Sequence, residues 1–169
     1  TAHFLATDGP HDAIITETDH VELKMKNVTG IDRRNDACIL NTGSPHYVTQ
    51  VNQLSELDVY ANGRMIRYNQ EFQKEGINVN FIEPLTDGIA IRTYERGVED
   101  ETLSCGTGAT AAALSVAGEK NGPQELNVYT SGGLLSVKFT KTGAELFEDI
   151  WLCGPATFVF EGTIETAHL

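Results

Sequence analysis

The chain has 169 residues, of which 40% are hydrophobic, and its 24 acidic and 12 basic side chains give a net charge of −12. This length suits one sizeable domain, or two small lobes that share a core. The acidic balance argues against nucleic acid or an anionic membrane as a partner, because phosphate binding needs clustered Lys and Arg, and no apolar run approaches the ~20 residues of a membrane span.

Most of the expected elements in the first half are strands. The sequence VELKMKNV, residues 21–28, alternates apolar and polar side chains with the period of a half-buried strand. DACILN, residues 36–41, predicts another strand, and TGSPHYV, residues 42–48, predicts a proline turn that leads into an extended run. A helix is expected over residues 58–72, with Asp58 as its N-cap.

The second half predicts further strands on either side of a second helix. They are INVNFIEPL and GIAIRTYERG joined by a TDG turn, the hairpin ELNVYTSGGLLSVKF with Leu135, Val137 and Phe139 on one face, and the strands DIWLCG and TFVFEGTIE. The helix, GTGATAAALSVAGEK over residues 106–120, has small side chains that let a sheet surround it closely, so we expect it to be central and buried. We find no repeat and no internal domain boundary.

The start of this helix offers an anion site. Its first turn holds Thr107 and Gly108 in place of bulky side chains. Backbone N–H groups at a helix start have no intrahelical partners, and the helix dipole favours negative charge there. Glycine lets a ligand approach the backbone closely. A carboxylate could therefore dock at this end of the helix.

The three cysteines, Cys38, Cys105 and Cys153, are an odd number without CxxC spacing, which indicates neither a disulfide framework nor a metal site. A reducing, cytoplasmic setting follows. Cys38 and Cys153 lie in apolar, strand-like runs and are expected in the core. Cys105 directly precedes the helix start, a setting that lowers a thiol pKa from roughly 8.5 to between about 3.5 and 7.5.

Spacing alone leaves two interpretations of Cys105. It is either a base beside a carboxylate site, suited to removing a proton alpha to that carboxylate, or a structural cysteine at a tight turn. His46 follows a proline turn, and Glu95 and Arg96 are adjacent at a strand end, where they would point to opposite faces. Taken alone, His46 would be a surface residue and Glu95 and Arg96 a solvated charge pair.

Together these residues carry a resemblance. The stretch ERGVEDETLSCGTGATAAA, residues 95–113, resembles the signature of the diaminopimelate epimerase family. TGSPHYV, INVNF and CGPATFVFEG resemble that family's Asn-Pro-His turn, Asn-Val-Gly-Phe strand and Gly-Pro-Ala strand, in the same order. The resemblance implies an α+β fold, a mixed and mostly antiparallel sheet wrapped around the central Ala-rich helix, as one of two similar lobes with the active site between them.

The resemblance also implies an activity. Family members interconvert LL- and meso-diaminopimelate, small-molecule amino acids that supply lysine and peptidoglycan precursors, and they need no cofactor. Two cysteines, one from each lobe, face opposite sides of the substrate's alpha carbon. One thiolate removes the proton and the other thiol delivers a proton to the opposite face.

Residue by residue, Cys105 matches the cysteine of the second lobe. Gly106 and Thr107 match the backbone groups that hold the reacting carboxylate at the helix start. Glu95 and His46 match residues that flank the reacting centre.

The distal end of the substrate, with its second carboxylate, is assigned by the same resemblance to Arg96 and Asn78. Three departures fall near this part of the family pattern. Ser44, a further expected substrate-binding residue, stands where the family usually has Asn before Pro-His, and Asn80 replaces the usual Gly of the Asn-Val-Gly-Phe strand. The loop VEDE, residues 98–101, makes the spacing to the cysteine one residue longer than usual.

The family's other cysteine, which a Gly-Asn-Gly motif follows, has no counterpart in the chain. We therefore interpret residues 1–30 as residual strands of the first lobe, and residues 31–169 as the C-terminal lobe, whose last strand packs back toward the first lobe. A lobe interface left uncovered in this way would favour association of two copies as a homodimer. A chain with one such cysteine is expected to be inactive alone.

Two other kinds of protein stay open. One is another isomerase of the same fold, either proline racemase-like or phenazine-biosynthesis isomerase-like. The phenazine type lacks this cysteine, and the proline type would not call for the pattern of Glu95, Arg96 and Asn78. The other is a non-catalytic ligand-binding domain, or a hydrolase that uses Cys105 and His46, which would need the histidine within hydrogen-bond reach of the thiol.

Overall fold

The computed structural model describes residues 1–6, 9–16 and 19–164. In chain order these residues form β1 (Ala2–Ala6), β2 (Gly9–Ile15), β3 (His20–Lys24), β4 (Val28–Thr29), β5 (Asp32–Arg33), β6 (Cys38–Asn41), β7 (Pro45–Gln50), the 3-10 helix η1 (Leu54–Glu56), α1 (Val59–Arg67), β8 (Asn78–Leu85), β9 (Gly88–Glu95), β10 (Asp100–Thr102), α2 (Gly106–Ser115), β11 (Gly122–Thr130), β12 (Gly133–Gly143) and β13 (Leu146–Pro155).

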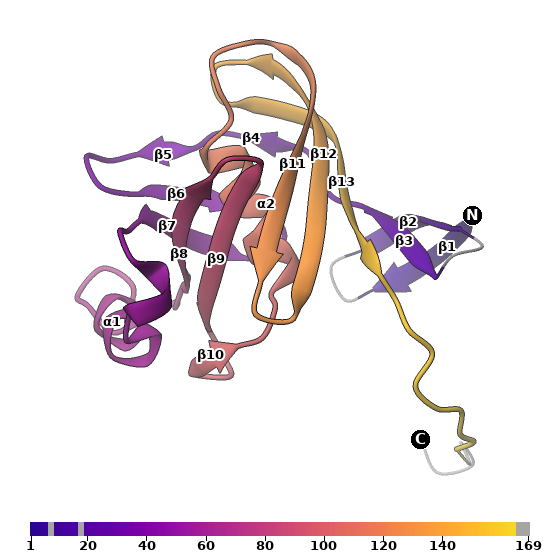
Figure 1. Ribbon diagram of the computed structural model, residues 1–169, viewed down its shortest axis with the longest axis horizontal. Coiled ribbons are helices and arrows are strands. Elements are labelled where there is room, and N and C mark those ends of the chain that lie inside the picture. The colour runs from indigo at the N-terminus through magenta and orange to yellow at the C-terminus, as the bar shows by residue number, and fades with distance from the viewer. Residues whose placement is uncertain (7–8, 17–18, 165–169) are drawn as a thin grey trace.

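The strands of this described part make one mixed sheet. Its order is β1-β2-β3-β13-β12-β11-β9-β8-β7-β6-β5, with β10 beside β9 and β4 beside β13. Neighbours are parallel at β7–β8 and β9–β11, and the other pairs are antiparallel. The sheet curves around α2, while β1 and β2 project to one side (Figure 1). The expected α+β fold is confirmed.

The helix α2 is central and buried, as its alanines predict. Ala109 and residues 111–114 are 0% exposed. Apolar side chains of the surrounding strands complete this core, among them Ile82, Ile89, Ile91, Val128, Val137, Phe139, Phe147 and Ile150. The helix ends at Ser115, five residues earlier than expected. Neither α-helix of the described residues is long and apolar enough to cross a membrane.

The helix α1 covers the opposite face of β8 and β9. Asp58 caps it as expected, because the carboxylate accepts the N–H of Ala61 at 2.9 Å. Gly63 sits against the ring of Tyr94, where a Cβ would collide, and this contact explains a glycine inside a helix. The helix ends at Arg67 rather than near residue 72, because the side chain of Asn69 accepts two backbone N–H groups and closes a turn.

The strand expected over residues 157–165 is wrong for the residues that the structure describes. The N–H of Ala156 still donates to the carbonyl of Asp19 at 2.7 Å, and residues 157–164 then lead away from the body of the molecule without forming a strand (Figure 1). Phe158, Val159 and Phe160 are 76%, 83% and 82% exposed. The neighbouring β3 begins at His20, opposite Pro155, so no strand of the described residues lies beside residues 157–164 to supply hydrogen-bond partners. Glu165 lies outside the described residues.

Candidate active site

Cys105 occupies the N-cap position of α2, with extended backbone angles. Its sulfur makes no capping hydrogen bond of normal geometry, but the N–H groups of Thr107 and Gly108 face it and favour the thiolate. The hydroxyl of Thr107 lies 3.5 Å from the sulfur. Gly108 is needed at this position, because a Cβ there would lie 3.3 Å from the sulfur and 2.5 Å from Oδ1 of Asn80.

The expected lowering of the pKa of Cys105 does not occur in this structure. Burial raises the pKa of the thiol and outweighs the Thr107 hydroxyl and the two backbone N–H groups, while the carboxylate of Glu95 adds to the increase. Burial likewise raises the pKa of Cys38 and of Cys153. Cys105 differs from the other two because its surroundings include several hydrogen-bond donors aimed at the sulfur.

His46 is fully buried, with 0% of its surface exposed, and is no surface turn residue. Its Nε2 lies 3.0 Å from the hydroxyl oxygens of both Ser44 and Thr107. Burial lowers the pKa of His46 to about 3, and the positive charge of Arg96 acts in the same direction. At neutral pH the ring is therefore uncharged. It faces the Thr107 hydroxyl between itself and Cys105, and this disfavours a hydrolase in which the histidine deprotonates the thiol directly.

Asn80 holds the other side of the His46 ring. Its Nδ2 lies 3.1 Å from Nδ1 of His46 and donates to the carbonyl oxygen of Tyr47 at 3.0 Å. Its Oδ1 accepts the hydroxyl of Thr93 at 3.0 Å. Sequence reasoning noted Asn80 only as a departure and missed Thr93. A polar residue inside the apolar run of β8 is the signal that could have found this site, since buried amides require partners.

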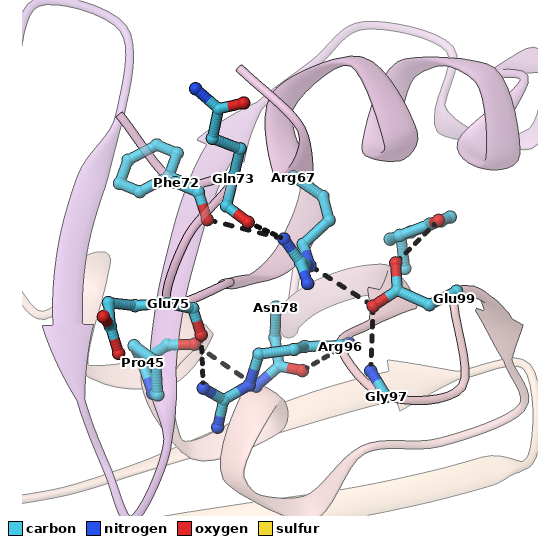
Figure 2. A network of polar contacts seen from close by, with 10 residues as sticks. Pro45, Arg67, Phe72, Gln73, Glu75, Asn78, Arg96, Gly97 and Glu99 are labelled. Atoms are coloured by element: carbon cyan, nitrogen blue, oxygen red, sulfur yellow. Dashed lines mark hydrogen bonds and ion pairs between the residues drawn. The ribbon is translucent and has the colours of Figure 1, made fainter. Parts of the chain in front are cut away.

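Asn78 forms hydrogen bonds to two separate segments of the site, the Ser44–Pro45 turn and the backbone of Arg96. Its Oδ1 accepts the backbone N–H of Arg96 at 2.8 Å, and its Nδ2 donates to Ser44 Oγ at 3.0 Å and to the carbonyl of Pro45 at 3.2 Å. Both ends of the amide are thus used within the protein (Figure 2). The guanidinium of Arg96 is exposed and donates to the carbonyl of Glu75 at 3.0 Å, so its other N–H groups face outward.

The turn after Arg96 is held by Glu99. Its carboxylate accepts the N–H of Gly97 at 3.1 Å, Nε of Arg67 at 3.3 Å and the hydroxyl of Tyr94 at 3.2 Å (Figure 2). Burial alone would raise the pKa of this carboxyl, but the Gly97 N–H, two tyrosine hydroxyls and the charge of Arg67 together hold it below its ordinary value. Glu99 belongs to the loop of residues 98–101, which is one residue longer than the family pattern. The hydrogen bonds of its carboxylate hold this longer loop in place.

Comparison with known proteins decides the family. Residues 38–159 match the family "Diaminopimelate epimerase". The chain is 46% identical over 163 residues to the diaminopimelate epimerase of Flavobacterium psychrophilum, covering 95% of this chain and 63% of that protein. It is 44% identical over 128 residues to the enzyme of Aquifex aeolicus, covering 74% of this chain and 44% of that protein. The chain belongs to the diaminopimelate epimerase family. It spans less than two thirds of these two relatives.

Solved structures support the fold assigned to this epimerase family member. A PhzF-family phenazine biosynthesis protein of Bacillus anthracis superposes with a TM-score of 0.65 at 15% identity, covering 94% of this chain and 67% of that one. A probable proline racemase of Agrobacterium radiobacter superposes with a TM-score of 0.61 at 17% identity, covering 95% of this chain and 59% of that one. At such identities the likeness concerns the fold alone.

The other two cysteines of this epimerase family member lie away from Cys105. Nη1 of Arg33 lies 3.5 Å from Cys38 Sγ and donates to the carbonyl of Ser115, the last residue of α2. Cys38 is therefore beside the far end of a ten-residue helix, ~15 Å from Cys105 at 1.5 Å per residue. Cys153 is 1% exposed, and it follows Leu152, which packs toward the α2 core, so its side chain points to the outer face of the sheet.

Two other features of the described residues lie outside this cluster or at its edge. His20, Glu22 and Cys153 offer ligand atoms within 4.8 Å of one another, but the ammonium of Lys138 already donates to the Glu22 carboxylate at 2.7 Å. This arrangement is an ion pair and a poor cation site. A cavity of about 210 Å³ borders Thr107 and lies between the helix start and β3, with Leu23 and Met25 in its wall.

The structure thus places all eight site residues expected from the sequence in one region. Cys105, His46, Thr107 and Ser44 are linked through hydroxyl contacts, and Asn78 bonds to Ser44. Three more residues lie at the edge of this cluster. The carboxylate of Glu95 accepts the hydroxyl of Thr102 and raises the pKa of Cys105. Arg96 follows Glu95 in the chain, and Gly106 is the first residue of α2.

Proposed function

We propose that this chain provides one half of the active site of a cofactor-independent diaminopimelate epimerase, and that Cys105 is one of its two acid–base groups. The observation that carries this proposal is the thiol at the start of α2, with the Thr107 hydroxyl and two backbone N–H groups facing the sulfur. These groups favour the thiolate that must remove the alpha proton. The raised pKa keeps the thiol a strong base once deprotonated.

The substrate's reacting carboxylate would dock at the first turn of α2, at the N–H groups of Gly106 and Thr107. These donors would stabilise the negative charge that develops when the alpha carbon loses its proton. The exposed guanidinium of Arg96 would bind the second carboxylate, at the distal end. Asn78 would position Arg96 and the Ser-Pro-His turn, since its amide is already hydrogen-bonded within the protein.

Inversion needs an acid on the face of the alpha carbon opposite Cys105. Cys38 is beside the far end of α2, and Cys153 points to the outer face of the sheet. His46 is neutral, and its Nδ1 faces the Asn80 amide. We therefore propose that the second thiol comes from outside this chain, so that residues 1–169 alone do not invert the substrate.

The test is incubation of the 169-residue chain with meso-diaminopimelate in deuterium oxide. We expect deuterium at the alpha carbon without LL-isomer, because a lone base can exchange the proton but returns it to the same face. Cys105→Ala is the matched variant and should abolish the exchange. Inversion at ordinary enzyme rates by the chain alone would overturn the half-site proposal, and exchange that survives Cys105→Ala would overturn the role of Cys105.

A cytoplasmic location and a homodimer remain predictions. The three free cysteines of the described residues agree with a reducing compartment. The exposed apolar side chains of residues 158–160 would favour association. Light scattering after size-exclusion chromatography measures the oligomeric state, and a monomer at high protein concentration would contradict the homodimer.

A further inference from the structure

A series of polar side chains in contact with one another runs from β9 to the thiol of Cys105. It begins at Thr93, passes through Asn80 and His46, and reaches Cys105 through the hydroxyl of Thr107, with successive separations of 3.0, 3.1, 3.0 and 3.5 Å. Asn80 and His46 are each 0% exposed, so water cannot replace these contacts.

The orientation of the Asn80 amide is fixed by its other partners. The carbonyl oxygen of Tyr47 can only accept, so the atom of Asn80 that faces it is the NH₂ group, and the same group faces Nδ1 of His46. The opposite atom, Oδ1, accepts from the hydroxyl of Thr93. Nδ1 of His46 therefore faces a donor, and it must be the unprotonated nitrogen of the ring.

A neutral His46 then carries its proton on Nε2, which faces the hydroxyl oxygens of Ser44 and Thr107. Because Nε2–H cannot accept, the hydroxyl hydrogen of Thr107 must point to another acceptor. The candidates are the sulfur of Cys105 and Ser44 Oγ, but the two acceptor positions of Ser44 Oγ are filled by Asn78 Nδ2 and by Nε2–H of His46, each at 3.0 Å. The other tautomer would offer Nε2 as an acceptor and draw the Thr107 hydrogen away from the sulfur.

We propose that Asn80 is a positioning residue, which fixes His46 as the Nε2–H tautomer and thereby directs the Thr107 hydroxyl toward the Cys105 thiolate. This proposal rests on the proposed function in one respect, the use of the Cys105 thiolate as a base. It also gives a role to the one residue in the INVNF strand that departs from the family pattern.

The first measurement is the protonation of the His46 ring by long-range ¹H–¹⁵N NMR of the 169-residue chain. We expect a pyridine-type signal at Nδ1 and a pyrrole-type signal at Nε2. In N80D the donor to Nδ1 is lost, and the proton should move to Nδ1. N52D, which adds the same charge at an exposed position, should leave the ring unchanged. A proton on Nδ1 in the unmodified chain would overturn the proposal without any variant.

The second measurement is the rate of iodoacetamide reaction at Cys105, relative to Cys38 in the same molecule. We expect N80D and T107V each to slow Cys105 by about tenfold or more, as for loss of a hydrogen bond to a charged group. The double variant should be no slower than T107V alone, because Asn80 acts through that hydroxyl. Additive effects, or an unchanged rate in T107V, would overturn the proposal.

Neither measurement uses diaminopimelate. Absence of exchange in the deuterium experiment would therefore refute the proposed function and leave the hydrogen-bond chain intact, whereas a wrong tautomer would refute the hydrogen-bond chain alone.

Discussion

Gly108→Ala changes the free energy of unfolding in two opposite ways, through helix propensity and through packing. Alanine favours a helix over glycine by about 1 kcal/mol, so propensity alone would stabilise α2. The added Cβ, however, would lie 2.5 Å from Oδ1 of Asn80. Asn80 cannot move aside freely, because Thr93, Tyr47 and His46 hold both ends of its amide. Overpacking costs about 1–3 kcal/mol, and disturbing a buried hydrogen bond costs about 1–3 kcal/mol more.

The net expectation for Gly108→Ala is a loss of about 1–5 kcal/mol of unfolding free energy, and each kcal/mol lowers the melting temperature by about 2–4 °C for a chain of this size. Urea unfolding and calorimetry measure it. Gly118→Ala is the matched control, since a Cβ there would meet nothing within 4 Å. A Gly108→Ala chain as stable as the parent would show that helix propensity dominates and that the packing of α2 against Asn80 is looser than described.

Three further predictions concern single side chains. In a preparation that epimerises diaminopimelate, Arg96→Met should weaken binding of diaminopimelate about tenfold or more and leave a monocarboxylate amino acid unaffected, and equal weakening of both would contradict the assignment. The pKa of Glu99 is lowered on folding, so the ionised carboxylate stabilises the folded state. Its contribution to the unfolding free energy is fully present above its unfolded pKa of about 4.3 and is lost as pH falls through the folded pKa. Glu99→Gln should therefore cost about 1–3 kcal/mol at pH 7 and progressively less in acid, whereas a pH-independent difference in urea titrations would contradict this. Asp58→Ala removes the cap on Ala61 and should cost about 1 kcal/mol, and an unchanged melting temperature would contradict the cap.

The strands were predictable where one face is buried. The alternation in residues 125–139 gave the hairpin of β11 and β12, with Leu135, Val137 and Phe139 in or against the core around α2. Small side chains correctly indicated that α2 is enclosed. The strand expected at residues 157–165 was wrong for the described residues, because an apolar β-branched run specifies a strand only where a neighbour supplies hydrogen bonds.

The residues of the candidate site were predictable from their resemblance to a family, but their chemistry was not. A sequence cannot give the burial that raises the pKa of Cys105 above its ordinary value or that lowers the pKa of His46 to about 3. It also could not show that Asn78 is hydrogen-bonded within the protein, because its partners Ser44 and Arg96 are 34 and 18 residues away in sequence.

The position of β13 has a consequence for how the chain is made. β13 is the last strand of the described residues in chain order, yet it lies between β3 and β12, and Trp151 pairs with Lys24. Its Phe147 and Ile150 are both 0% exposed and fill the core around α2. A nascent chain that has not yet released residues 146–155 from the ribosome therefore keeps β3 apart from β12 and leaves α2 open on one side. Folding of this sheet must wait until β13 is free to pair, and a protein with such distant pairings exposes apolar surface during that wait, as substrates of chaperones do.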